Sequence, residues 1–148
     1  MKRAFCILLA ALLLCGFAAL LTGCGALKKA AQLQSYDFGP DSIPSVNSVV
    51  GERQVTGVQS GTGGSGTYKE FTYESGTVSE DLIAYLIDGL LAKDWYALVD
   101  FNLLELPGKA QLARKSADSG QILIMDVSYE QSGYTIRLTK GEGTLSLN

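Results

Sequence analysis

The chain holds few side chains of the kinds that carry out catalysis. Histidine is absent, so no Ser-His-Asp triad, Cys-His pair or histidine-containing metal site can be built from it. Carboxylate pairs can work as acid–base groups, as in glycosidases. Here their positions indicate other roles: Glu80 and Asp81 stand at a helix start, and Asp126 stands opposite Arg137. We expect no catalytic residue, no bound metal and no cofactor.

A glycine-rich run from Gly61 to Gly66 invites comparison with a phosphate-binding loop. Such a loop opens onto the N-terminus of a helix, usually through Gly-Lys-Ser/Thr. Here the run leads into Thr67-Tyr68-Lys69, which has the pattern of a strand. We therefore interpret the run as a flexible hairpin loop.

The cysteines of the chain, Cys6, Cys15 and Cys24, lie close to its start. Met1-Lys2-Arg3 is a cationic head, and residues 4–21 are uncharged and rich in leucine and alanine. This is the pattern of a secretory signal peptide. It ends in Leu21-Thr22-Gly23-Cys24, where the cysteine thiolate is a nucleophile able to accept a lipid as a thioether.

That ending resembles the lipobox of bacterial lipoproteins, in which a branched apolar residue and two small residues precede a cysteine. The resemblance implies a signal peptide at residues 1–23, cleavage after Gly23 and lipid attachment at Cys24. It also implies a protein held at the cell membrane on the side outside the cytoplasm. An uncleaved transmembrane anchor is the alternative, because residues 4–21 approach the roughly 17–25 residues that span a bilayer.

Charge and length limit the classes of partner. Cleavage after Gly23 would leave 148 − 23 = 125 residues and, without Lys2 and Arg3, a net charge of −3 − 2 = −5. An acidic chain without a basic cluster is unsuited to the phosphate backbone, so we expect no nucleic-acid partner. Residues 24–45 carry turn and breaker residues and predict a flexible tether. Residues 46–148 are enough for one domain.

Hydrophobic patterning predicts the elements of that domain. Residues 46–58 and 68–73 have the pattern of strands. Thr77-Val78-Ser79-Glu80 matches a capping box with Thr77 as the N-cap. The apolar stripe of an amphipathic helix follows at Leu82, Ile83, Leu86, Ile87, Leu90 and Leu91. The helix ends near Lys93 or continues to Val99.

Four further strands complete the prediction. A type II turn at Pro107-Gly108 would place Leu103 opposite Leu112, with Trp95 facing the core. A turn at residues 117–120 leads into a strand over 121–129. The turn at residues 130–133 then pairs Tyr129 with Tyr134 and Asp126 with Arg137. The basic side chains of Lys109, Arg114 and Lys115 are interpreted as charge that opposes edge-to-edge aggregation.

The predicted fold class is α+β: an antiparallel sheet of five to six strands in the order β-β-α-β-β-β-β, with one amphipathic helix on one face. One helix cannot cover so wide a sheet, so the other face should be exposed. Its apolar residues, the candidate partner-binding residues, are Tyr96, Leu98, Ile122 and Ile124. The stretches Gln111-Leu112-Ala113-Arg114 and Gly133-Tyr134-Thr135-Ile136, with Trp95 after the helix, resemble small uncharacterised one-domain lipoproteins of Gram-positive anaerobes. That resemblance implies no activity.

Three functions remain open on these grounds. The leading hypothesis is a non-catalytic module that binds a protein or envelope component through the exposed sheet face. The second is a structural or accessory subunit of a membrane or envelope complex. The third, an envelope hydrolase that works without histidine, would need two unpaired acids in a deep pocket.

Overall fold

The computed structural model describes residues 23–146, which form an antiparallel sheet covered on one face. Its main sheet has the strand order β3-β4-β8-β7-β6-β5, and β1 and β2 form a separate hairpin. The elements are β1 (Ser35–Phe38), β2 (Asp41–Pro44), α2 (Val46–Val50), β3 (Gln54–Gly63), β4 (Gly66–Glu74), α3 (Val78–Leu82), η1 (Ile83–Leu91), β5 (Tyr96–Ala97), β6 (Gly108–Lys115), β7 (Gln121–Glu130) and β8 (Gly133–Glu142). A further helix spans residues 23–31.

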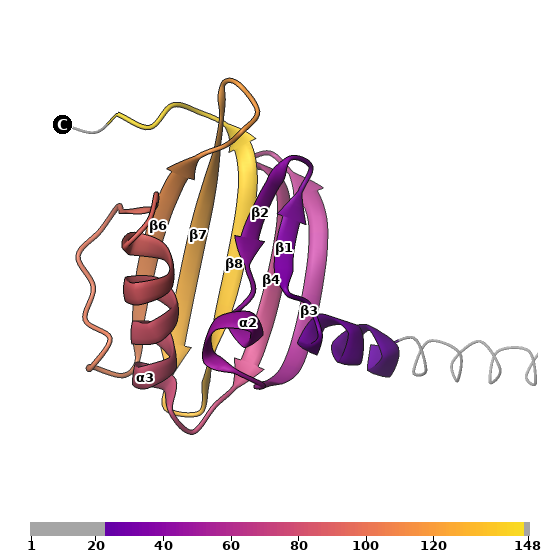
Figure 1. Ribbon diagram of the computed structural model, residues 1–148, viewed down its shortest axis with the longest axis vertical. Coiled ribbons are helices and arrows are strands. Elements are labelled where there is room, and N and C mark those ends of the chain that lie inside the picture. Colours follow the sequence, from indigo (N-terminus) through magenta and orange to yellow (C-terminus); the bar gives the residue numbers. More distant parts are fainter. Residues whose placement is uncertain (1–22, 147–148) are drawn as a thin grey trace, which may run out of the picture.

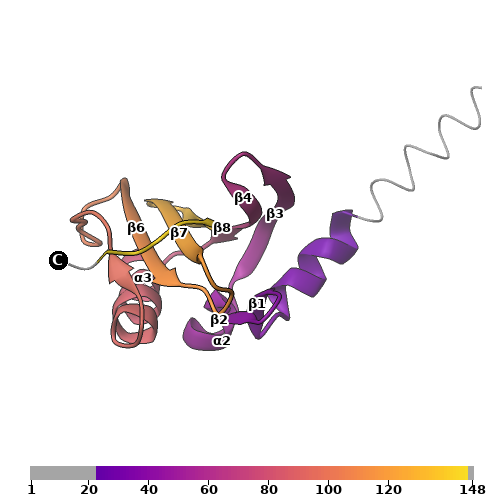
Figure 2. The same ribbon diagram turned by 90° about the horizontal axis from the view of Figure 1, so that it is seen from above.

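The two faces of the main sheet differ in what covers them. The helices α2, α3 and η1 and the β1–β2 hairpin lie on one face, called the inner face here (Figures 1 and 2). No helix or strand of residues 23–146 covers the opposite, outer face. The α+β class is confirmed, although the β1–β2 hairpin adds strands that the sequence pattern did not predict.

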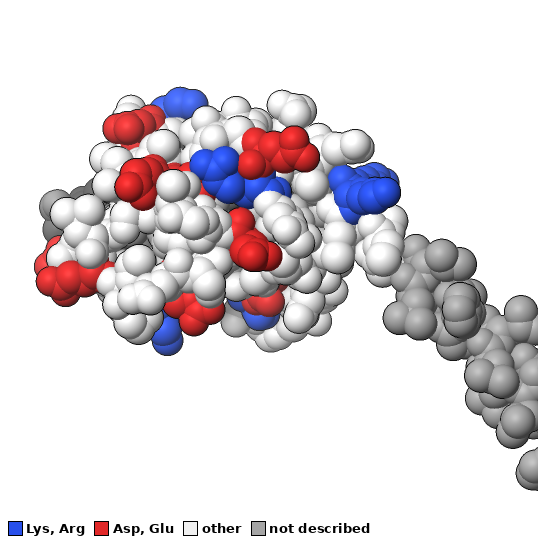
Figure 3. Space-filling model, turned by 90° about the horizontal axis from the view of Figure 1, so that it is seen from below, with Lys and Arg blue, Asp and Glu red and all other residues white. Residues whose placement is uncertain are grey.

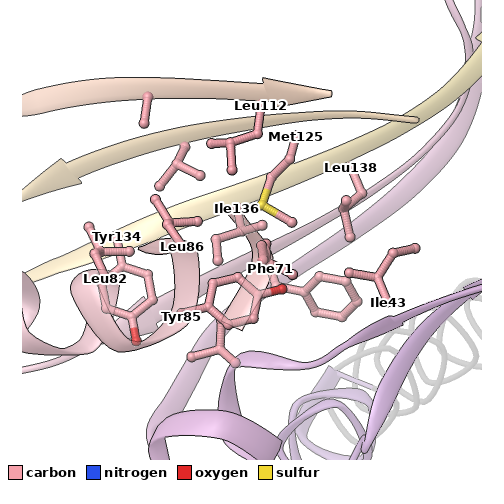
Figure 4. Packing of buried hydrophobic residues seen from close by; sticks show 14 of the residues in the cluster. Ile43, Phe71, Leu82, Tyr85, Leu86, Leu112, Met125, Tyr134, Ile136 and Leu138 are labelled. Carbon is pink, nitrogen blue, oxygen red and sulfur yellow. The ribbon is translucent and has the colours of Figure 1, made fainter. Parts of the chain in front are cut away.

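The core lies between the inner face and the helical layer (Figure 4). The π-helix η1 continues α3, and the two bury Leu82, Tyr85 and Leu86. The inner face contributes buried side chains from the central strands, namely Phe71, Leu112, Leu123, Met125, Ile136 and Leu138. Full burial of one such side chain stabilises the fold by about 1.5–3 kcal/mol. The helix ends at Leu91, close to the earlier of the two predicted ends.

The start of this helix is held by tertiary contacts instead of a capping box. Thr77 is the N-cap, but its side chain accepts no capping hydrogen bond. The Ser75 hydroxyl accepts from the Thr77 backbone N–H at 3.0 Å, and it donates to the buried Asp81 at 2.7 Å. The prediction placed the helix start correctly and misassigned the groups that hold it.

The tether prediction for residues 24–45 is wrong over most of its length. Residues 23–31 are helical, and β1 and β2 form a hairpin whose Tyr36, Phe38 and Ile43 join the core. Gly39, at φ 64°, and Pro40 form the turn between the two strands. Breaker residues therefore connect two paired strands here, and the folded body begins before residue 46.

The β3–β4 hairpin also differs from its prediction. Val46–Val50 forms the short helix α2, which ends at Gly51 with a φ of 87°, and the strand begins only at Gln54. The strands then pair as far as Gly63 and Gly66. Most of the glycine run is therefore strand, with only Gly64 and Ser65 in the turn.

The predicted register is correct for the central pair β7–β8 and wrong at the β5 edge of the sheet. The β7–β8 pairing matches the prediction, with Tyr129 opposite Tyr134 and Asp126 opposite Arg137. In contrast, β5 has two residues, and Ala97 lies opposite Leu112 in place of Leu103. Residues 98–107 form a loop between β5 and β6, and Leu103 of this loop is buried in the core.

Candidate functional site

Outward-facing residues of neighbouring strands form rows that cross the outer face. The central row, called the polar row here, consists of Gln111, Asp126, Arg137 and Glu70, from β6, β7, β8 and β4. Side chains directly opposite on antiparallel strands lie within contact distance. The row therefore places two acids, one cation and one amide side by side on an uncovered surface.

Contacts within the polar row leave much of its hydrogen-bonding capacity open. Gln111 Nε2 donates to Asp126 Oδ1 at 2.6 Å, and Arg137 Nη1 donates to Glu70 Oε2 at 3.3 Å. The guanidinium of Arg137 also lies 3.9 Å from the centre of the Tyr68 ring. Arg137 has further N–H donors, and its side chain is 44% exposed. The predicted Asp126–Arg137 cross-strand position is correct, but the ion pair of Arg137 is with Glu70.

The predicted partner-binding residues lie beside this row. Tyr96, Ala113 and Ile124 follow one another across β5, β6 and β7. Tyr96 is 42% exposed and Leu98 is 43% exposed, whereas Ile122 and Ile124 are half-buried. Ala113 faces outward in the pairing and is nevertheless fully buried. The prediction missed the polar row, whose signal was the alternation of polar residues with core residues along β7 and β8.

Three neighbouring hollows lie on the outer face along the polar row. A hollow of about 370 Å³ is lined by the β3–β4 turn, Ile122 and Ile124, and one of about 410 Å³ by Val99 and Lys109. Both are lined by Gln111, Asp126 and Arg137. A third hollow, of about 600 Å³, shares Lys109, Ser128 and Thr135 with the second. Because neighbouring hollows share lining residues, we call the three together the outer groove.

Three of the outward positions on β3 carry no side chain. They are Gly57, Gly61 and Gly63, which pair with Thr72, Tyr68 and Gly66, whereas the outward residue Gln59 pairs with Glu70 of the polar row. A Cβ on Gly61 would lie 3.1 Å from the Tyr68 ring, which is closer than ordinary contact. The glycine run thus shapes a polar groove in the structure, and it does not open onto a helix as a phosphate loop would.

The strongly paired acids lie away from the groove and hold the fold together. Asp81 is 3% exposed and accepts hydrogen bonds from Arg53, at 2.6 and 2.7 Å, and from Tyr134 at 3.2 Å. Burial acts to raise the pKa of Asp81, but the hydrogen bonds from Arg53 and Ser75 outweigh it and the pKa lies below its usual value. The ion pair joins the residue just before β3 to the start of the helix.

A second ion cluster joins the β1–β2 hairpin to the main sheet. Asp41 is buried, and its carboxylate lies 2.7 Å from Lys140 Nζ and 3.6 Å from Arg114. The pKa of Asp41 is lowered, because hydrogen bonds from Lys140 and Ser116 outweigh the effect of burial. Arg114 faces the inner side, 5.5 Å from the centre of the ring of buried Trp95. Its interpretation as charge against edge aggregation is therefore wrong.

Cys24 lies exposed on the helix of residues 23–31. The predicted signal peptide up to Thr22, including the first two residues of the motif that resembles a lipobox, lies outside the described residues. Over residues 23–146, no helix is long and apolar enough to cross a bilayer. The same part of the chain contains no group of three His, Cys, Asp or Glu side chains placed to hold a metal ion.

Surface charge is mixed where Figure 3 shows the molecule from below. Acidic and basic side chains alternate over that surface, and a separate basic area lies on the helix next to the grey segment. The chain matches no known family model, no curated protein and no solved structure. Its function is therefore inferred from its own residues.

Proposed function

We propose that the protein is a lipid-anchored lipoprotein of the cell membrane, facing outside the cytoplasm, and that it is a non-catalytic module which binds its ligand in the outer groove. The observation that carries the binding role is the polar row, where Asp126, Arg137 and Glu70 lie uncovered along adjoining hollows. Ligand sites typically combine a concave surface with a few convergent polar groups. The anchor rests on the lipobox resemblance at Cys24.

The acids with displaced pKa values lack the property that a general acid needs. A general acid at neutral pH needs a carboxyl group whose pKa is raised toward 6–7. The displaced carboxyl pKa values in the structure, those of Asp37, Asp41 and Asp81, are all lowered, so these groups stay ionised. Each is lowered by hydrogen bonds within the fold. These acids therefore serve as structural anions.

The open edge of the sheet favours the accessory-subunit role as a second candidate. β3 is the first strand in the order of the main sheet, so one of its edges is unpaired there. No charged residue occurs from Gln54 to Tyr68, although edge strands commonly carry lysine to prevent pairing. A partner strand could add to this edge with main-chain hydrogen bonds.

Matched substitutions separate the groove from the edge. Asp126→Ala and Ile124→Asp alter the groove, whereas Asp88→Ala and Ile87→Asp make the same changes at exposed positions on η1. Ser60→Lys places a charge on β3. Association with components of the native membrane is measured by affinity capture of the lipidated chain under mild detergent.

The proposal predicts loss of the same captured component in both groove variants and its retention in both η1 variants. Loss only in Ser60→Lys would support the accessory-subunit role. Equal capture by all five variants would refute binding through either surface.

A further inference from the structure

The helix of residues 23–31 is fixed to the body at its C-terminal end. Ala30 is 5% exposed, and Leu27 packs against the core. The side chain of Asn47 in α2 donates to the Ala31 carbonyl at 3.0 Å, and Ser45 Oγ donates to the Leu33 carbonyl at 2.5 Å. Both a hydrophobic contact and backbone-directed hydrogen bonds therefore hold the segment that follows Cys24.

Asn47 links this helix to the sheet as well. Its amide donates to the Arg53 carbonyl at 3.1 Å, and its oxygen accepts from the Arg53 backbone N–H at 3.3 Å. Arg53 in turn forms the buried ion pair with Asp81. The helix end, α2, the start of β3 and the start of α3 are thus connected by one set of polar contacts.

The distance between lipid site and body is consequently short. Cys24 precedes the buried Ala30 by six residues, which in a helix is an axial rise of roughly 9 Å. A flexible segment of about 20 residues would instead reach roughly 25 Å and allow free rotation. In Figures 1 and 2 the helix runs outward past β3, away from the sheet.

Lys28 and Lys29 provide the chemistry for a membrane contact. They are exposed on this helix and form the only basic pair between Cys24 and Glu52. Their backbone positions lie roughly 6–8 Å along the axis from Cys24, which is within one Debye length at physiological salt. Lysines this close to a bilayer are attracted to anionic headgroups.

From the docked helix and its lysines we infer that residues 24–31 of the mature chain form a rigid stand, which fixes the height and orientation of the body on an anionic membrane surface. Lys28 and Lys29 contact the lipid headgroups, and the bilayer faces the side of the body next to β3. The inference rests on the proposed lipid attachment at Cys24. It means that the outer groove is presented at a constant height.

The test uses the mature lipidated chain in nanodiscs of phosphatidylglycerol and phosphatidylcholine. Ser119→Cys adds one exposed label site in the β6–β7 turn. Acylation blocks the thiol of Cys24, and Cys6 and Cys15 leave with the signal peptide, so labelling is specific. Time-resolved energy transfer from this label to headgroup acceptors gives the mean height and its spread.

Two insertions after Ala26 serve as a matched pair. Seven alanines add about two helical turns and raise the label by roughly 10 Å without widening the distribution. Seven alternating Gly and Ser residues interrupt the helix and widen the distribution of label heights. In a third variant, Lys28→Glu/Lys29→Glu increases the mean height on anionic nanodiscs and leaves it unchanged on neutral ones.

A wild-type distribution as broad as that of the Gly/Ser variant would overturn the rigid stand. An equal height for the wild type and the charge-reversed variant on anionic nanodiscs would overturn the headgroup contact. The intact mass of the mature N-terminus is measured on the same samples. An acylated N-terminus with a broad distribution refutes the stand alone, whereas an unacylated one refutes the proposed anchor and the stand with it.

Discussion

Replacing Asp81 by alanine removes the most highly connected anion in the structure. The carboxylate is 3% exposed and accepts hydrogen bonds from Arg53, Ser75, Thr77 and Tyr134. These partners come from the residue just before β3, from β8 and from the segment before α3. The substitution therefore releases the start of the helix from two strands of the sheet.

The magnitude follows from what remains after the substitution. Breaking a buried ion pair by removing one partner costs about 3–5 kcal/mol, because the other charge is left uncompensated. The side chain of Arg53 is 26% exposed and can recover part of its hydration. We therefore expect the Asp81→Ala variant to lose about 3 kcal/mol of unfolding free energy, at the low end of that range.

Urea unfolding of the mature chain carrying Cys24→Ser measures this loss without a lipid. The exposed residue Asp88 gives the control, because Asp88→Ala should change the free energy of unfolding by less than about 0.5 kcal/mol. A loss below about 1 kcal/mol in Asp81→Ala would refute the structural role of the ion pair, since surface pairs have that magnitude.

The pH dependence gives an independent check on the same group. The pKa of Asp81 is lower in the folded state than its ordinary value of 3.8. A depressed folded pKa contributes stability that is complete above the unfolded pKa and is lost as the pH falls through the folded pKa. The wild type should therefore lose more stability than Asp81→Ala when the pH is lowered from above 4 to below the folded pKa. Parallel pH profiles would contradict this.

Three further predictions concern the core, the hairpin and the groove. Met125 is fully buried, so Met125→Ala should cost about 2–5 kcal/mol in urea unfolding, and a loss below 1 kcal/mol would contradict the packing. Tyr36→Phe removes the hydroxyl that bonds Tyr73 and accepts from the Val46 N–H, and it should cost about 1–3 kcal/mol, whereas an unchanged unfolding curve would show that these bonds contribute nothing. Gly61→Leu places a side chain against the Tyr68 ring in the outer groove, so it should abolish capture of the groove ligand while the chain remains folded by circular dichroism; full capture would exclude this position from the site.

The sequence predicts structure well where local turn chemistry and side-chain alternation agree. The predicted turn over residues 130–133 and the alternation of Met125, Val127 and Tyr129 indicate one register, and β7 and β8 pair in that register. Trp95 is buried as its pattern predicts. In both cases the determining interactions are between residues close in the chain or in adjacent strands.

Long-range contacts explain what the sequence did not reveal. Asp41 meets Lys140, and Arg53 meets Asp81, across separations that no local pattern encodes. Without those partners, the charged and breaker residues around Gly39-Pro40 look like a solvated linker, although Tyr36 and Phe38 alternate with polar residues as in a strand.

The outer groove was unpredictable for a related reason. A β-bulge between Val55 and Gly57 shifts the alternation along β3, and this shift decides which glycines face outward. The sequence pattern also favoured one strand from Trp95 to Leu103, whereas the structure has the two-residue β5 followed by a loop. The apolar residues of the outer face could be identified from the alternation of residue types. The outward glycines of β3 beside them could not.

Site-specific photocrosslinking in the native membrane tests the central claim most directly. A photoreactive amino acid replaces Ile124 in the groove or, as the control, Ile87 on η1, and the adducts of the lipidated chain are compared. Ligand binding in the outer groove predicts a discrete adduct from position 124 that disappears with Asp126→Ala and is absent from position 87. The same adducts from both positions, unaffected by Asp126→Ala, would contradict it.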